Sequence, residues 1–413
     1  MLLALVTSAF ACPTIATGTP MPLSFDSAAV AIVREGRRTT FSVSINPVGD
    51  PQEFALVLPV PQVLAEDEVQ TLDAEIFARL DGYSAPRHVA DAGCSQYSYG
   101  AANDSAESDG GGGMDDDGSV EVEAEYLVGD YLVVILSAEE SLGLETWLSV
   151  NGYHLPDGAD ERLAEYIEGG SYFLAAKVAP GADIADGSPL APLQVSYESD
   201  IFSIPMRLAT LNSPGEQDMV IYAITDVNAS DGGLVGIANY PEFTVPDKCM
   251  WVNENDDFSA FYDDLFTGEW LSTNDAGWAM EYAGVPGDCS PCSGVYVDEA
   301  DIAALGFKGD YYSQHLTRLH MRYTPEQATE DLALYGSGLY QPKVTSFADR
   351  NPANFECIDR TCAGDDDGEP DVVAPAPLDD FWACDSGGSG VAGLAGVVGA
   401  VAMMRRRPRS HAR

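Results

Sequence analysis

The sequence predicts an α+β protein with mostly antiparallel β-sheet, several short amphipathic helices and stabilising disulfide bonds. Apolar segments of strand length follow one another with short turns between them, which favours antiparallel pairing. Other short stretches carry apolar residues at helical spacing. If two of the eight cysteines belong to processing of the chain ends, six remain, an even number that fits disulfide bonds formed outside the cytosol.

Residues 1–11 predict a signal peptide that is truncated at its start. They are apolar and end in Ala9-Phe10-Ala11, which places small residues at the −3 and −1 positions of a cut before Cys12. The positively charged beginning of such a signal is missing. Three interpretations stay open: ordinary secretion, a lipoprotein whose Cys12 is acylated after cleavage, and no signal.

Residues 12–99 predict a β-rich N-terminal part. Alternating apolar residues over 28–33 and 40–45, joined by the link 34–37, predict a hairpin. The continuous apolar run 54–60 predicts a strand that is buried on both faces. A helix follows, with an apolar face made by Leu72, Ile76, Phe77 and Leu80.

Residues 100–119 predict a flexible acidic loop or linker, because Gly110–Gly113 and Asp115–Asp117 lie among serine and asparagine residues. Clustered carboxylates also suit calcium, but this segment has no EF-hand spacing. A second calcium-like motif, Asp226–Gly232, has its glycine one place late and Ile237 in the position of the twelfth-place glutamate. A turn is the better interpretation of that motif.

Residues 120–345 predict the main α+β part. Its predicted strands cover 131–136, 172–178, 193–197, 204–210, 219–225 and 314–322. Its predicted helices begin at Ser137, Asp256, Asp298 and Pro325, and a further short helix carries Leu163, Tyr166 and Ile167 on one face. Alternation predicts that the odd-numbered residues of 193–198 point inward and that Gln194, Ser196 and Glu198 face solvent. The aromatic stripe of the helix over 256–267 is interpreted as core rather than as a platform for a ligand.

The C-terminal residues predict a tether and an anchor. Residues 346–384 combine cysteines and prolines with acidic residues, which predicts an extended tether. Residues 385–413 contain an uncharged run of 19 residues, Ser386–Met404, which is followed by arginines. A helix of this length would just span ~30 Å of hydrocarbon. The arginines would stay on the cytoplasmic side.

Cys384 lies immediately before this tail and resembles the cysteine of myxobacterial C-terminal sorting signals, the MYXO-CTERM type. The resemblance implies that a sorting protease processes the tail at Cys384 and that the mature end is lipid-linked. The expected partners are therefore the membrane, reached through the C-terminal helix or through a lipid-linked Cys384, and the sorting protease.

The other cysteines predict disulfide bonds whose connectivity stays open. The candidates are Cys94, Cys249, Cys289, Cys292, Cys357 and Cys362. Cys357 and Cys362 are expected to close a small loop, and Cys12 could also pair with Cys94. The CxxC motif at 289–292 lies in a predicted loop, so a structural disulfide is preferred there to zinc binding or redox chemistry.

The charge of the chain excludes several partners. Its 413 residues include 66 acidic and 20 basic side chains, for a net charge of −46. Nucleic acid is excluded because phosphate binding needs clustered lysine and arginine, and a basic face for anionic lipid is missing as well. Such acidity fits either a saline habitat or an acidic extracellular surface.

The sequence lacks the common catalytic and cofactor-binding motifs. It has no GxSxG, P-loop or dinucleotide fingerprint, and its histidines do not form HExxH. His315 and His320 are five residues apart, which places them on opposite faces of a strand. We therefore predict no catalytic residue, no cofactor and no metal ligand.

Three stretches resemble an uncharacterised bacterial family called domain of unknown function 2330. They are DPQEFALVLPVP at 50–61, the segment from Leu136 through NGYHLPDG to Tyr172-Phe173, and LAPLQVSYESD at 190–200 with IPMRL at 204–208. The motifs at 289–292 and 316–319 also fit, and the similarity covers 12–345. Members usually carry a second cysteine soon after the N-terminal one, where this chain has Pro13-Thr14-Ile15. The resemblance implies an exported, often surface-attached protein and brings no known activity.

These observations predict a membrane-anchored protein at the outer surface of a bacterial cell envelope. We expect a non-enzymatic envelope or binding module of unknown ligand. The alternative is an extracellular hydrolase with a carboxylate or metal site. Convergence of Asp, Glu and His side chains in a concave pocket would favour the hydrolase.

Overall fold

The computed structural model describes residues 9–10, 14–17, 25–47, 54–89, 120–138, 141–151, 155–156, 158–179, 190–212, 215–246, 258–288 and 292–348. All of them belong to one unit, residues 1–349, whereas a second unit, residues 350–413, lies outside the described residues. The predicted acidic loop 100–119, the tether beyond Ala348 and the anchor 385–413 also lie outside them.

The main sheet has nine strands within the described residues. Its order is β18 (Lys343–Val344), β15 (Gly277–Gly284), β16 (Gln314–Tyr323), β13 (Gln217–Asp226), β3 (Phe25–Glu35), β4 (Arg38–Pro47), β11 (Leu193–Glu198) and β6 (Val69–Thr71), with β1 (Ala9–Phe10) paired to β13. β13 runs parallel to β3 and β1, and the other pairs in this sheet are antiparallel. Strand β1 lies in the predicted signal peptide, so cleavage before Cys12 would remove it.

Three smaller sheets complete the described strands. The second sheet has the antiparallel order β2 (Thr14–Thr17), β5 (Phe54–Val60), β10 (Tyr172–Val178), β9 (Tyr131–Ala138) and β8 (Val120–Val128). A three-stranded antiparallel sheet contains β12 (Ser203–Ile204), β17 (Leu332–Gly336) and β14 (Val235–Ile237), and β7 (Arg87–Val89) pairs in parallel with β19 (Ser346–Ala348). The predicted dominance of antiparallel sheet is therefore confirmed.

The described residues contain five α-helices, which confirms the α+β class. They are α1 (Glu75–Ser84), α2 (Ser141–Val150), α3 (Ala159–Glu168), α4 (Phe258–Thr273) and α5 (Glu299–Ala304). Among the helices of the described part, none combines the length and the apolar composition needed to cross a membrane.

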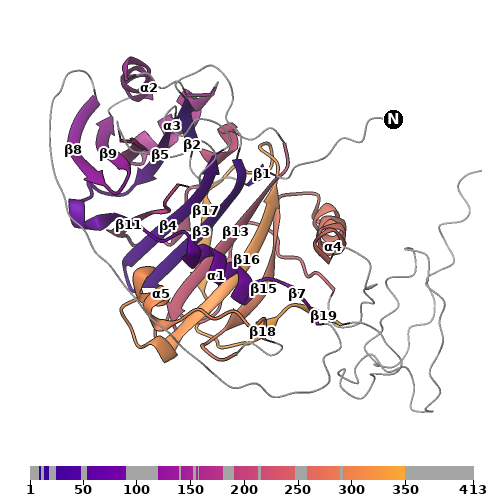
Figure 1. The fold of residues 1–413 in the computed structure, drawn as a ribbon. Helices are drawn as coiled ribbons and strands as arrows, with labels where there is room; N and C mark the ends of the chain where they lie inside the picture. The colour runs from indigo at the N-terminus through magenta and orange to yellow at the C-terminus, as the bar shows by residue number, and fades with distance from the viewer. Residues whose placement is uncertain are drawn as a thin grey trace, which may run out of the picture. The chain divides into compact units, whose positions relative to one another are not determined.

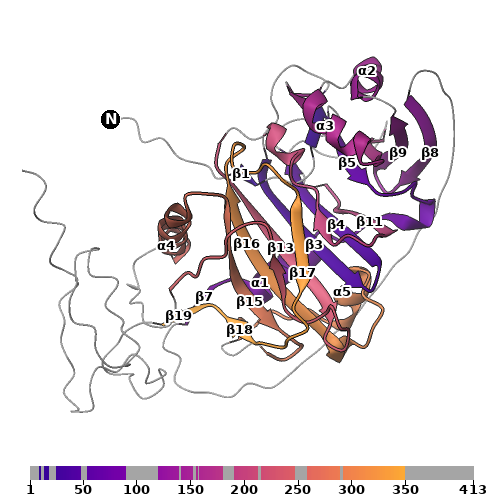
Figure 2. The ribbon, with the colours of Figure 1, turned by 180° about the vertical axis from the view of Figure 1, so that it is seen from behind.

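Both faces of the main sheet are covered by other elements. On one face, Val30, Ile221 and Leu319 share an apolar core with residues of the second and the three-stranded sheets. On the other face, α1 and α5 pack around Tyr222, and α4 packs through Phe266. Figures 1 and 2 show this arrangement, with α1 in front of the main sheet in one view and β17 in front of it in the other. Helices α2 and α3 pack on the second sheet.

Several local predictions are confirmed. Strands β3 and β4 form the predicted hairpin around Gly36, which adopts a φ of 61°. Strand β10 has the predicted bounds 172–178. Helix α5 begins at the predicted position because the Asp298 side chain accepts a hydrogen bond from the Asp301 N–H and caps the helix. The parts predicted as 12–99 and 120–345 contribute strands to the same sheets.

Three other local predictions are wrong. The helix expected at Ser137 begins at Ser141, since Ser137 lies at the end of β9 and donates its hydroxyl hydrogen bond to Glu123 of β8. The strand expected over 204–210 reduces to β12 and a 3₁₀ turn at Ala209–Asn212. The residues after Pro325 form turns rather than a helix, and the Gln327 side chain accepts a hydrogen bond from the Thr324 N–H.

Gln194 and Ser196 were predicted to face solvent, but both are buried. The Gln194 amide donates to Ser42 Oγ at 2.8 Å and to the carbonyl of Ala304 in α5 at 3.1 Å. Ser196 Oγ lies 3.0 Å from Thr40 Oγ1. Alternating polar and apolar residues predict that the polar side chains face solvent only where one face of the sheet is open to solvent. Here residues around α5 cover the second face.

Candidate functional site

A cluster of buried and nearly buried charged side chains lies on the helix-covered face of the main sheet. It contains Asp218 of β13, Glu281 of β15, and Arg318, His320 and Arg322 of β16, and we call it the ionic cluster. The β16 residues lie at alternate positions, so their side chains share one face. A β-bulge between Met280 and Tyr282 interrupts the pairing of β15 with β16. The bulge turns Glu281 and Tyr282, which are consecutive, toward the same face.

The ionic cluster is held by short, charge-assisted hydrogen bonds. Arg322 donates to both oxygens of Asp218, at 2.6 and 2.7 Å. Arg318 Nε donates to Glu281 Oε2 at 2.5 Å. His320 Nδ1 lies 2.7 Å from Glu281 Oε1. His320 Nε2 lies 3.3 Å from Asp218 Oδ1 but is not aligned for a hydrogen bond.

Helix α4 closes the cluster. Tyr262 donates its hydroxyl hydrogen bond to Glu281 at 2.6 Å. Arg322 donates to Asp263 and to Thr267, each at 2.6 Å. The ring of Phe266 stacks on the His320 imidazole at a centroid distance of 3.9 Å. Each of these contacts attaches the helix to the sheet.

The charges of the cluster shift one another's protonation. Burial alone would lower the pKa of His320, but the neighbouring charges of Glu281 and Asp218 outweigh it and raise that pKa to about 9. Burial alone would raise the pKa of Glu281, but His320 and Arg318 outweigh it and lower that pKa to about 2. The pKa of Asp218 is lowered as well, since His320 and Arg322 outweigh its burial.

These protonation states define what the cluster can do. A histidine between two carboxylates has the form of an acid–base relay. At neutral pH, however, His320 is an imidazolium and cannot accept a proton, and Phe266 covers its ring. The cluster therefore has a structural role: its hydrogen bonds and ion pairs hold α4 against β13, β15 and β16.

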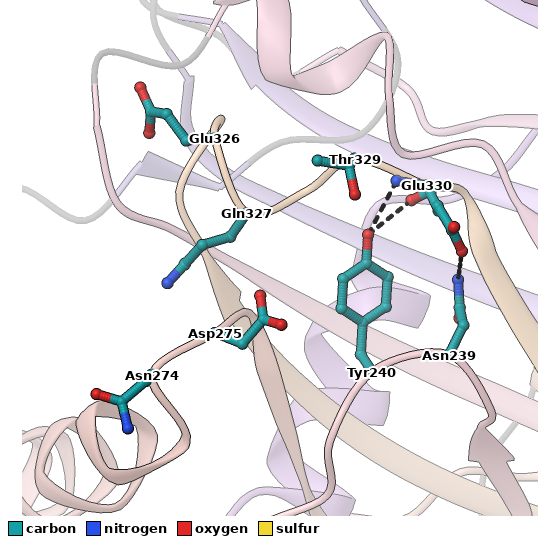
Figure 3. Close-up of a pocket in the computed structure, with 8 residues that line it drawn as sticks. All are labelled: Asn239, Tyr240, Asn274, Asp275, Glu326, Gln327, Thr329 and Glu330. Carbon is teal, nitrogen blue, oxygen red and sulfur yellow. Dashed lines mark hydrogen bonds between the residues drawn. The ribbon is translucent and has the colours of Figure 1, made fainter.

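A separate open pocket of about 420 Å³ lies at the C-terminal end of α4 (Figure 3). Three chain segments line it: Asn239 and Tyr240 after β14, Asn274 and Asp275 after α4, and four residues within 326–330 between β16 and β17. Asn274 has a φ of 56°. Asparagine tolerates this left-handed conformation, which turns the chain out of the helix.

Hydrogen bonds fix one wall of this pocket. The Tyr240 hydroxyl donates to the Glu330 carbonyl at 3.0 Å and accepts from the Glu330 N–H at 3.1 Å. Asn239 Nδ2 donates to the Glu330 carboxylate at 3.2 Å, and Asn239 Oδ1 accepts from the Ala333 N–H at 3.0 Å. Figure 3 shows Tyr240 and Asn239 side by side beneath this segment.

The pocket is electrostatically negative. Its lining includes the carboxylates of Asp275, Glu326 and Glu330, and its eight lining residues contain no lysine, arginine or histidine. The C-terminal end of α4 adds partial negative charge. Amide and hydroxyl groups complete the lining. Such a surface suits hydroxyl groups and cations and disfavours anions.

The predicted site residues fall mostly outside the described part. Cys12, Cys384 and five of the six disulfide candidates lie there, so their roles stay predictions. Cys292 is described, exposed and disulfide-bonded. Within the described part, no group of three or more His, Cys, Asp or Glu side chains could hold a metal ion.

The calcium-like motif forms a turn, as predicted. The backbone N–H and the side-chain amide of Asn228 both donate to Asp226 Oδ1, at 2.8 and 3.0 Å. This is the local hydrogen bonding of an Asx turn.

Sequence reasoning missed the ionic cluster and the pocket. The cluster has one readable signal: Arg318, His320 and Arg322 alternate with Leu319 and Met321, so both faces of a buried strand are specified. The pocket has no such signal, because its residues come from three distant segments.

The fold and its sites define an α+β protein in which a buried ionic cluster fastens a helix to the main sheet beside an open acidic pocket. The chain belongs to DUF2330, a family described as uncharacterized protein conserved in bacteria, which it matches over residues 6–335. This confirms the family resemblance. No curated protein and no solved structure matches the chain.

Proposed function

We propose that this chain is an exported protein, anchored at the outer surface of a bacterial cell envelope, where it acts as a non-enzymatic binding module. The observation that supports the binding role is the separation of its two polar sites. The closely packed acid–base groups lie under α4, whereas the open pocket offers amides, hydroxyls and carboxylates without a histidine. Groups of this kind recognise a ligand through hydrogen bonds and charge.

The proposed export and membrane attachment rest on the two chain ends. A signal peptide before Cys12 would export the chain, and a tail processed at Cys384 would retain it on the membrane through a lipid. Disulfide bonds among the remaining cysteines would stabilise the body outside the cytosol. The high net negative charge of −46 suits a soluble body at a cell surface.

Export and membrane attachment are tested by the intact mass of the chain recovered from the cell surface, measured with and without reductant. We expect a chain that begins at Cys12 and ends at Cys384, with added lipid mass and with a mass increase on reduction. A chain that still ends at Arg413 would contradict processing of the tail.

Binding and hydrolysis can be separated in a second measurement. The purified chain is incubated with isolated envelope polymers, and sedimented protein and soluble products are both measured. Retention without product release supports a binding module. Product release that disappears in Asp275→Asn would instead support the hydrolase alternative.

A further inference from the structure

The outer face of the three-stranded sheet carries an exposed aromatic ring. Tyr335 of β17 is 43% exposed, whereas Leu332 and Leu334 on the opposite face of the strand are buried. Gly236 of β14 pairs directly with Tyr335. A Cβ at Gly236 would lie 2.6 Å from the Tyr335 hydroxyl oxygen. The ring therefore extends across Gly236, and only glycine leaves room for it.

The side of the ring that faces Gly236 has a structural role. An aromatic side chain that covers a cross-strand glycine shields the backbone and stabilises the strand pair. The exposed surface of Tyr335 remains open for contact with a ligand.

Strand β17 connects this ring to one wall of the acidic pocket. Ala333 precedes Tyr335 by two residues on the same face of β17, a distance of about 7 Å along a strand. The Ala333 N–H donates to Asn239 Oδ1 at 3.0 Å, and Asn239 lines the pocket. An extended ligand could therefore reach both the ring and the pocket.

We infer that Tyr335 and the acidic pocket together form a binding site for amino sugar units of a glycan. This inference rests on the proposed binding function and specifies its ligand. The negative face of the tyrosine ring attracts the C–H face of a sugar and a nearby ammonium group. The amides and hydroxyls of the pocket match sugar hydroxyls.

The carboxylates decide which sugar is selected. Asp275, Glu326 and Glu330 attract an ammonium group and repel a uronic acid, and the lining contains no basic residue that would reverse this preference. An N-acetylated sugar retains the hydroxyls and the C–H face but loses the charge. Comparing the two sugars isolates the contribution of the carboxylates.

Isothermal titration of the exported full chain tests this inference with four probes. The probes are a glucosamine tetramer, its N-acetylated tetramer, a galacturonate tetramer and tetralysine. We expect the glucosamine tetramer to bind at least about tenfold more tightly than the N-acetylated tetramer, about 1.4 kcal/mol. We expect no binding of the galacturonate tetramer, and weaker binding at high salt because the attraction is screened.

Variants assign the binding to the ring and to the carboxylates. Tyr335→Ala should weaken glucosamine binding about tenfold or more, and Tyr335→Phe should retain it, because the ring rather than the hydroxyl is used. Asp275→Asn combined with Glu330→Gln should remove the preference for the amino sugar. Tyr312→Ala is the matched control, because Tyr312 is 77% exposed and does not line the pocket. Melting temperatures exclude loss of folding as the cause.

The remaining outcomes contradict either the inference or the proposed function. Equal binding of tetralysine would show a site for cations rather than for sugars. Unchanged binding by Tyr335→Ala, or no binding of any sugar, would overturn the inference while surface retention leaves the proposed function intact. Release of sugar products by the wild-type chain would overturn the non-enzymatic function itself.

Discussion

The stability of this protein should depend on pH through His320. The imidazole lies between Glu281 and Asp218, and its pKa in the folded state is raised from 6.5 to about 9. The folded state therefore binds this proton more tightly than the unfolded chain. The resulting stabilisation is fully present below pH 6.5 and is lost as the pH rises through 9. At 1.36 kcal/mol per pH unit, the stabilisation amounts to roughly 3 kcal/mol.

Urea unfolding of the wild type and of His320→Gln, followed by tryptophan fluorescence, measures this contribution. Glutamine cannot carry the proton, so the difference in unfolding free energy between the two proteins should shrink by roughly 3 kcal/mol between pH 6.5 and pH 9. A constant offset from altered packing would not change with pH. His315→Gln on the same strand is the control, because burial lowers the pKa of His315 to about 4 and keeps it neutral over this range.

Two results would refute this reasoning. The first is a difference between wild type and His320→Gln that stays constant from pH 6.5 to pH 9. The second is an NMR titration of the His320 ring with its midpoint near 6.5, the ordinary value for histidine. Either result would mean that the two carboxylates do not hold the imidazolium.

Two further pairs of substitutions, each a test and its control, examine the packing. Glu281→Gln should lower the unfolding free energy, measured in urea, by ~3–5 kcal/mol, because buried cations lose their carboxylate. Asp263→Asn, at a half-exposed partner of Arg322, should lower it by ~1 kcal/mol or less. Equal losses in the two variants would contradict the role of burial. Gly306→Ala should lower the melting temperature, since Gly306 has a φ of 99° and its Cβ would lie 2.7 Å from Thr40. Gly268→Ala, with open space in α4, should instead stabilise by ~0.5–1 kcal/mol, and a stable Gly306→Ala protein would exclude the predicted clash.

Sequence patterns were reliable where an element depends on its own residues. The hairpin around Gly36 and the cap at Asp298 follow from local backbone and hydrogen-bonding preferences, and both are in the predicted places. The patterns failed where a residue distant in the chain determines the secondary structure or the burial of a side chain. Ser137 fits a helix cap, but its hydroxyl bonds to Glu123 on the neighbouring strand. Gln194 alternates like a solvent-facing residue, but α5 covers it.

The candidate sites could be predicted only in small part. The alternating charges of Arg318, His320 and Arg322 are visible in the sequence, yet their partners Asp218 and Glu281 lie on other strands. Strand β15 was not predicted, and its bulge redirects Glu281 in a way that strict alternation does not describe.

The sequence by itself determined the α+β class, the bounds of many strands and the family, because apolar periodicity, turn residues and motifs are local properties of the chain. Tertiary structure alone decided that β13 pairs with β3, about 190 residues away in the chain. It also decided that two carboxylates and three cationic side chains pair beneath α4 and that three distant segments line one open pocket. Burial, ion pairing and cavity shape arise from side chains that meet only after the sheets have assembled.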